Sequence, residues 1–256
     1  MKRLLSDVAY DQLRDMVLVG RLSPGEPLSE AAISAAIGMS RSPIRTALEK
    51  LVGVGLVQRV PGKGYFVSTI SIATVTSVME VREALEGFAA AHGLYDSKRE
   101  VLKKLHWIFE HFATLTRDPT VKEWSLLAQA DRRFHAEVVA GINNPIATQT
   151  VEQLSLSLGQ VRSLAWSKTG RFRIGACEHV NIIDALLESN GALAQSLIEQ
   201  HISSAKALLI ELMSTRTSPD QMRSGFVSRN LRLDEWLSMD SAEPALMEEF
   251  MSTALR

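Results

Sequence analysis

The sequence is poor in cysteine and has no long apolar run, and both absences narrow the class of protein. Cys177 is the single cysteine in 256 residues, which excludes an intramolecular disulfide framework and fits a reducing compartment. No stretch approaches the ~20 apolar residues that a membrane-spanning helix needs. Residues 1–17 carry a charge every few positions, unlike a secretory signal peptide. We therefore expect a soluble, cytoplasmic protein with no membrane partner.

The sequence also lacks a strong excess of either charge and lacks the local motifs of common enzymes. Its formal net charge is −1, with nine Lys and Arg against six Asp and Glu in residues 1–70. An HExxH helix, a nucleophile elbow and a Walker-type phosphate loop are all absent. The N-terminal excess of +3 is small for a nucleic-acid binder, so a monomer would bind DNA weakly and a dimer would compensate.

Residues 29–67 have the pattern of two short helices followed by a β-hairpin. Ser29 can cap the first helix, and Gly38 can end it in the left-handed conformation that glycine adopts readily. A second helix over about 42–54 has Pro43 in its first turn and an apolar face of Ile44, Ala47, Leu48 and Leu51. β-type segments at 56–60 and 65–67 flank a glycine-containing turn. The pattern predicts a winged helix-turn-helix, although such elements also occur in domains that never contact DNA.

The polar residues at the start of the second helix are the candidates for contact with DNA. Helix-turn-helix proteins present this end of their second helix to base edges in the major groove. In this chain it carries Arg41, Ser42, Arg45 and Thr46 on the outward side. Lys63, between two glycines of the turn, could lie against a phosphate backbone.

Four segments of this region resemble the DNA-binding domain of GntR-type bacterial transcription regulators. They are GRLSPGEPLSE (20–30), IGMSRSPIRTAL (37–48), GLV (55–57) and GKGYFV (62–67). The resemblance implies that Arg41 and Arg45 read bases or bind phosphate. It implies backbone contacts for Ser40 and Ser42, and a wing tip formed by Lys63 and Gly64. Thr46 stands where the family usually has an acidic residue, a departure that concerns sequence preference.

From residue 72 onward the apolar residues recur at spacings of three and four, which is typical of helices. Turn residues divide this part into predicted helices at 72–94, 97–117, 120–140, 145–167, 172–189 and 191–214. Helices joined by short loops form an antiparallel bundle. The predicted fold is mainly α, with a winged helix-turn-helix domain over 1–70, an all-helical bundle over 71–214, and an extension over 215–256 of unassigned role.

One carboxylate and three histidines on these helices are candidate metal ligands. Asp131 and His135 stand four apart and share a helix face, while His179 and His201 lie in the middle of the last two helices. Such donors from facing helices could hold zinc, nickel, manganese or iron. Each histidine taken alone is more often an ordinary core or surface side chain, so spacing by itself does not establish a metal site.

A second resemblance concerns this bundle. The segments LAQADRRFH (127–135), EHVNIIDAL (178–186) and EQHI (199–202) are similar to the FCD-type ligand-binding domain of the FadR-like GntR subfamily. That resemblance implies a divalent metal, zinc first, bound by Asp131, His135, His179 and His201. His92, His106 and His111 match no such motif.

The resemblance also implies a small carboxylate effector. Arg82 lies in VREALEG (81–87), which resembles the first bundle helix of FCD domains, whose arginine points into the cavity. Arginine suits a carboxylate because its guanidinium can bind both oxygens. Arg162 could face inward as well, or could be a solvated surface residue. An organic acid could then bridge the metal and Arg82.

These expectations together predict a homodimeric transcription regulator, a repressor, which binds double-stranded operator DNA under the control of a small carboxylate metabolite. The alternative from another class is a metal-dependent hydrolase or lyase with an attached DNA-binding domain, since a metal with an open position can activate water. A regulator whose metal is purely structural is a third alternative.

Overall fold

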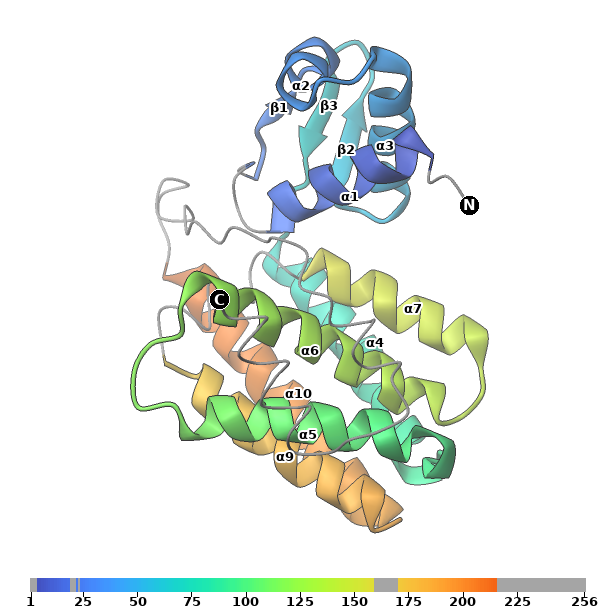
Figure 1. Ribbon diagram of the computed structural model, residues 1–256, viewed down its shortest axis with the longest axis vertical. Coiled ribbons are helices and arrows are strands. Elements are labelled where there is room, and N and C mark those ends of the chain that lie inside the picture. Colours follow the sequence, from blue (N-terminus) through green and yellow to red (C-terminus); the bar gives the residue numbers. More distant parts are fainter. Residues whose placement is uncertain (1–3, 19–21, 23, 159–169, 216–256) are drawn as a thin grey trace.

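The computed structural model describes residues 4–18, 22, 24–158 and 170–215 (Figure 1). Within these residues the chain forms an N-terminal domain with a small sheet and a larger all-helical domain, as the sequence predicts. The apolar side chains collect in two separate cores, one in each domain. Arg162 and the extension over 216–256 lie outside the described residues. None of the described helices is both long and apolar enough to cross a membrane.

The N-terminal domain is a winged helix-turn-helix. Its elements are α1 (Leu5–Leu18), β1 (Pro27–Leu28), α2 (Glu30–Ile37), α3 (Arg41–Gly53), β2 (Val57–Val60) and β3 (Gly64–Val67). The predicted caps of α2 are present, because Ser29 Oγ accepts a hydrogen bond from Ala32 N at 3.3 Å and Gly38 has a φ of 74°. The predicted apolar face of α3 is confirmed by four fully buried side chains, Ile44, Ala47, Leu48 and Leu51.

The sheet is antiparallel and has the strand order β1–β3–β2. Strands β2 and β3 form the predicted hairpin, with Val60 opposite Gly64. Strand β1 pairs Pro27 with Phe66 and was not predicted, because two residues are too few to show an alternating pattern. It ties the connection between α1 and α2 to the wing.

The helical domain contains all the helices that the sequence predicts, each beginning within two residues of its predicted start. They are α4 (Ile72–His92), α5 (Arg99–Thr114), α6 (Val121–Ala140), α7 (Pro145–Ser157), α9 (Phe172–Leu187) and α10 (Gly191–Ser214), with a short 3-10 helix η1 (Asp96–Lys98) before α5. Helix α7 ends ten residues before its predicted end at residue 167, and residues 159–169 lie outside the description. Helix α4 packs along α10 and α5 along α9, which gives the expected bundle (Figure 1).

The N-terminal domain lies beside the bundle, on the side where α7 runs (Figure 1). Leu156, near the end of α7, packs against the N-terminal core. The linker is short, since β3 ends at Val67 and α4 begins at Ile72, capped by Ser71. The two domains therefore meet through a packed contact as well as through the chain itself.

The start of α6 is fixed by a capping box and an ion pair. Glu123 accepts a hydrogen bond from Thr120 N at 2.6 Å, and Thr120 Oγ1 accepts one from Glu123 N at 3.3 Å. Both Nη atoms of Arg117 donate to Glu123, each at 2.8 Å. These hydrogen bonds from Arg117, opposed by burial, lower the pKa of Glu123 from 4.5 to about 2. The helix that carries Asp131 and His135 thus begins at a well-defined residue.

We expect Glu123→Gln to lower the thermal unfolding midpoint at pH 7 by roughly 2–4 °C, because it removes the charge-assisted pair with Arg117, although glutamine can still accept the capping-box hydrogen bond from Thr120 N. The folded pKa of Glu123 lies below its ordinary value, so the contribution is present above about pH 4.5 and lost as the pH falls towards 2. Melting curves at pH 7, 4 and 2.5 measure this. The exposed Glu152 on α7 supplies the control, Glu152→Gln. A difference from wild type that stays constant over this pH range would contradict the assignment.

Candidate metal centre and nucleic-acid interface

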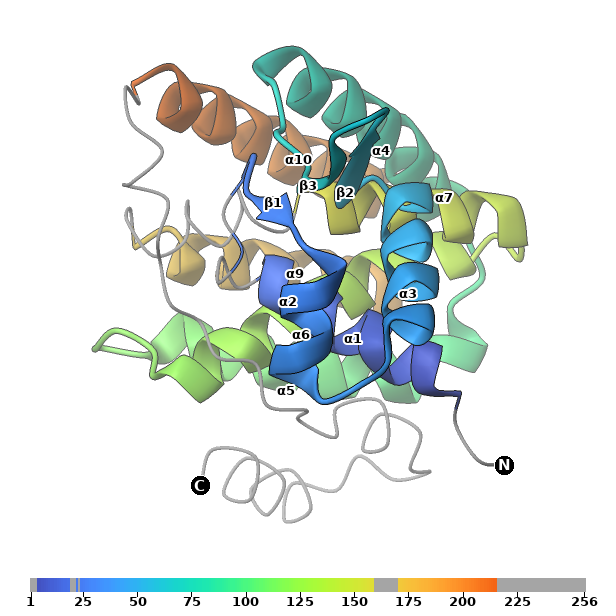
Figure 2. The same cartoon turned by 90° about the horizontal axis from the view of Figure 1, so that it is seen from above.

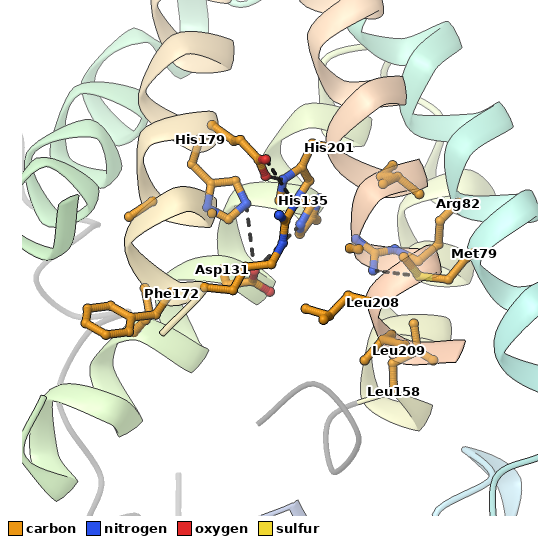
Figure 3. Close-up of a pocket in the computed structure, with 17 residues that line it drawn as sticks. Met79, Arg82, Asp131, His135, Leu158, Phe172, His179, His201, Leu208 and Leu209 are labelled. Carbon is orange, nitrogen blue, oxygen red and sulfur yellow. Dashed lines mark hydrogen bonds and ion pairs between the residues drawn. The ribbon is translucent and has the colours of Figure 1, made fainter. Parts of the chain in front are cut away.

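One carboxylate and three histidines from three helices meet inside the bundle (Figure 3). Asp131 and His135 come from α6, His179 from α9 and His201 from α10. One ring nitrogen of each histidine lies within 4.8 Å of those of the other two, and all three residues are buried. Asp131 Oδ1 lies 3.8 Å from Nε2 of both His135 and His179. The structure therefore brings together all four predicted metal ligands.

Two of the imidazoles are held from behind by carboxylates. Glu86 Oε2 lies 2.5 Å from His135 Nδ1, and Glu178 Oε2 lies 2.6 Å from His201 Nδ1. An ionised carboxylate only accepts, so each Nδ1 donates the hydrogen, and Nε2 is the ring nitrogen left over for the cluster.

The donor set fits a divalent ion. Two ligand atoms about 2.1 Å from an ion, at tetrahedral angles, lie about 3.4 Å apart. The 3.8 Å separations between Asp131 and two of the histidines are close to this value. Small inward movements of the side chains would complete the coordination, and nitrogen with carboxylate oxygen is a donor set that zinc accepts.

Charge is balanced behind the cluster by Glu86. Burial would raise the pKa of Glu86, but the charge of Arg82 and the hydrogen bonds from His135 and Arg82 outweigh it and lower the pKa to about 2. Burial lowers the pKa of His135 below its ordinary value, against the opposing influence of Glu86. Glu86 is therefore ionised and His135 is neutral, which is the form of imidazole that binds metals.

Arg82 has a structural role that the sequence analysis did not predict. Its Nε donates to Glu86 Oε1 at 2.7 Å, and its side chain is only 3% exposed. Nη1 lies 4.0 Å from Met79 Sδ, and Nη2 has no hydrogen-bond partner among the described residues. One edge of the guanidinium thus holds Glu86, and a single Nη group is left for another partner.

A cavity that is partly open to solvent lies between the histidines and Arg82 (Figure 3). Its polar lining consists of Arg82, Asp131, His135, Arg171, Glu178, His179 and His201. Apolar side chains form the rest of the wall, among them Leu127, Leu158, Phe172, Ile202, Leu208 and Leu209. The cavity combines a cluster of metal-type donors and a buried arginine with an apolar surface.

Glu86 and Glu178 are site residues that the sequence reasoning missed. Glu86 follows Arg82 by four positions, a spacing that predicts an ion pair on one helix face. Nothing in that spacing shows that the carboxylate also reaches His135, which lies on another helix. Glu178 directly precedes one candidate ligand, His179, yet it contacts the other, His201. Only the packing of the bundle reveals these two contacts.

The residues predicted to contact DNA form an exposed surface on the N-terminal domain. Ser40, Arg41, Ser42, Arg45 and Thr46 lie at the start of α3, and Lys63 and Gly64 in the turn between β2 and β3; all are exposed. Figure 2 looks down on this domain and shows α2 beside α3. Gly62 and Gly64, on either side of Lys63, have φ values of 74° and 95°, which residues with a side chain rarely adopt. Glu30, from α2, accepts hydrogen bonds from Arg45.

Comparisons with known proteins find a family match for each of the two domains. Residues 5–67 match the model of bacterial regulatory proteins of the gntR family, and residues 77–204 match that of the FCD domain. The HTH-type transcriptional repressor RspR of Escherichia coli (strain K12) is 27% identical over 197 residues, which cover 75% of this chain and 83% of RspR. The repressor GlaR of the same organism is 26% identical over 214 residues, which cover 80% of this chain and 96% of GlaR.

Among solved structures, the transcriptional regulator GntR from Rhodococcus sp. RHA1 shares the fold, with a TM-score of 0.66 and 23% identity. The match covers 83% of this chain and 99% of that one. Family and relatives alike are regulators, so the hydrolase or lyase alternative has no support. The chain belongs to the GntR family of bacterial transcription regulators, in the group that carries an FCD domain, and it is a DNA-binding regulator and not an enzyme.

Proposed function

We propose that this regulator is a metal-containing repressor, a homodimer whose affinity for operator DNA is set by a small organic acid bound in the bundle. The cavity between the histidine cluster and Arg82 carries this proposal. Repression is supported by two relatives that are named repressors, RspR and GlaR. A dimer is favoured because the N-terminal domain has a small positive charge, and two recognition helices one DNA turn apart would compensate for it.

Asp131, His135, His179 and His201 would hold the metal. Zinc is the first choice for a buried set of imidazoles and one carboxylate, with nickel, manganese and iron as alternatives. When bound, the ion supplies a positive centre with open positions for ligand oxygens. Glu86 and Glu178 orient two of the histidines from behind, a role in which carboxylates strengthen metal sites.

Arg82 would bind the end of the acid that faces away from the metal. Its Nη2 is buried in the cavity wall and lacks a partner among the described residues, and an unsatisfied buried donor favours any ligand that supplies an acceptor. Apolar side chains such as Leu127 and Ile202 would cover the carbon skeleton. The predicted contribution of Arg162 stays a prediction, since that residue lies outside the described part of the chain.

Helix α7 offers a route from the cavity to the DNA-binding domain. Leu158, just after the end of α7, is buried and lines the cavity. Leu156, two residues earlier, packs against the N-terminal core. A ligand that displaces Leu158 would thereby change how the N-terminal domain packs against α7. The acid can alter DNA affinity only as far as its own affinity differs between the two arrangements.

Metal binding is tested by analysing the purified chain after removal and return of Zn²⁺ or Ni²⁺. We expect about one ion per chain in the wild type and a higher unfolding temperature in its presence, because the ion binds only the folded bundle. His179→Ala should lose both effects, and His92→Ala, an exposed histidine outside the cluster, should keep them. Failure of the wild type to retain any metal would refute the site. If removal of the metal unfolds the bundle, the structural-metal alternative is favoured.

Effector binding is tested by calorimetric titration of small mono-, di- and tricarboxylates into the metal-loaded protein. We expect at least one acid to bind the wild type and Arg82→Lys to bind it at least tenfold more weakly, because lysine keeps a charge beside Glu86 but lacks the guanidinium fork. Lys98→Arg, which keeps the charge of a residue that pairs with Glu137 and does not line the cavity, serves as the control. Equal binding by Arg82→Lys and wild type would exclude Arg82 as an effector ligand.

The coupling route is tested with a duplex selected by the wild type from a randomised library and with the acid found above. We expect Leu156→Ala to bind metal and acid normally. The acid should lose most of its effect on DNA affinity, because the alanine side chain is too short to contact the N-terminal core. Leu154→Ala, which removes a side chain packed in the bundle core instead, should keep the response. An unchanged response in Leu156→Ala would show that coupling takes another path.

A further inference from the structure

Arg45, the predicted base-reading residue, is held by a carboxylate from the neighbouring helix. Glu30 Oε1 and Oε2 accept hydrogen bonds from Arg45 Nε at 3.0 and 3.2 Å, and Oε2 accepts another from Nη2 at 2.9 Å. The two residues are fifteen positions apart, so the packing of α2 against α3 creates the pair. The Arg45 side chain remains 64% exposed, whereas that of Glu30 is 21% exposed.

The pair occupies only one edge of the guanidinium. Nε and one hydrogen of Nη2 face Glu30, and the two hydrogens of Nη1 and the second hydrogen of Nη2 are left over. This remaining edge has two parallel donors. A guanine presents two acceptors at a matching spacing in the major groove, N7 and O6, and arginine binds them through such an edge.

Glu30 is itself fixed and charged. It is the first residue of α2, where the aligned backbone dipoles favour a carboxylate. The hydrogen bonds from Arg45, with a further contribution from the charge of Arg41, lower the pKa of Glu30 below its ordinary value. The carboxylate therefore stays ionised at neutral pH and holds Arg45 in one direction.

Arg45 differs in this respect from its neighbour Arg41. Arg41, one turn earlier on α3, makes no ion pair with any residue that the structure describes. A free arginine loses rotamer freedom when it binds, and a guanidinium that is already oriented loses less. Orientation also restricts which base edge can satisfy its donors, and this restriction discriminates between bases.

We propose that Glu30 is a specificity-determining residue of this regulator, which positions Arg45 so that its free edge reads a guanine. DNA binding itself follows from the family, but the inference rests on the proposed role of Arg45 as a base reader. A carboxylate so near the DNA repels phosphates and lowers affinity for all sequences. Glu30 thus reduces general affinity and increases discrimination. An exposed ion pair stabilises a fold very little, so the domain does not need Glu30 in order to fold.

The experiment selects preferred sites from a randomised duplex library with the full-length protein and sequences them. It compares the wild type with Arg45→Ala, Glu30→Gln and a matched control, Glu49→Gln. Glu49 is an exposed carboxylate on α3 that accepts hydrogen bonds from Arg59 at 3.1 Å and Tyr65 at 2.5 Å. Its replacement removes the same charge from the same domain and leaves the Arg45 pair intact. Thermal unfolding of each variant verifies that it is folded.

The base position at which Arg45→Ala loses its preference for guanine identifies the base that Arg45 reads. At that position we expect Glu30→Gln to lower the preference for guanine about tenfold, the size of one well-made arginine–guanine contact. Affinity for unselected DNA should stay the same or rise. Glu49→Gln should keep the full guanine preference.

Two outcomes would overturn the proposal, and they are distinguishable. If Glu30→Gln gains affinity for all sequences equally and keeps its guanine preference, Glu30 merely repels phosphate. If Arg45→Ala changes no base preference, the role of Arg45 as a base reader fails, and the proposal for Glu30 fails with it.

Discussion

A buried carboxylate must be paired with a cation or a hydrogen-bond donor. The way in which Glu86 is paired determines how α4, α6 and the cavity wall are arranged. It is fully buried on α4 and accepts from Arg82 on its own helix and from His135 on α6. An unpaired charge there would be strongly destabilising, so the two helices are held in one register. The same contacts turn His135 Nε2 towards the other histidines and bury Arg82 in the cavity wall. One ion pair thus shapes both sides of the proposed ligand site.

Two chains of contacts with the same chemistry run behind the histidine cluster. On one side Arg82, Glu86 and His135 form the series arginine–carboxylate–imidazole. On the other side Arg171 donates to Glu178 at 3.0 Å, and Glu178 holds His201. Both arginines also line the cavity. An anion that competes for either arginine would weaken the pair between that arginine and its glutamate. The glutamate would then hold its histidine less firmly. The proposed effector and the proposed metal are therefore electrostatically linked.

The sequence predicts elements whose signal is local and misses contacts that only packing creates. Long apolar periodicity located every described bundle helix, and Ser29 and Gly38 located the ends of α2. Strand β1 was missed because Pro27 and Leu28 have no pattern of their own and pair only because the wing lies beside them. For the candidate site, family motifs named the four clustered ligands. The contacts of Glu86 with His135, of Glu178 with His201 and of Glu30 with Arg45 were missed, because each joins two helices at a separation that no spacing rule encodes.

The end of α7 places a limit on how such a regulator can diverge. Leu158 lines the cavity and Leu156 packs on the N-terminal core, with one residue between them. Under the proposed coupling, a substitution at position 158 that fits the cavity to a different acid also changes how the DNA-binding domain packs against the end of α7. Adaptation to a new metabolite is therefore easier through the walls formed by α9 and α10, at positions such as Phe172 or Leu208. The residues beside α7 are constrained by both functions at once.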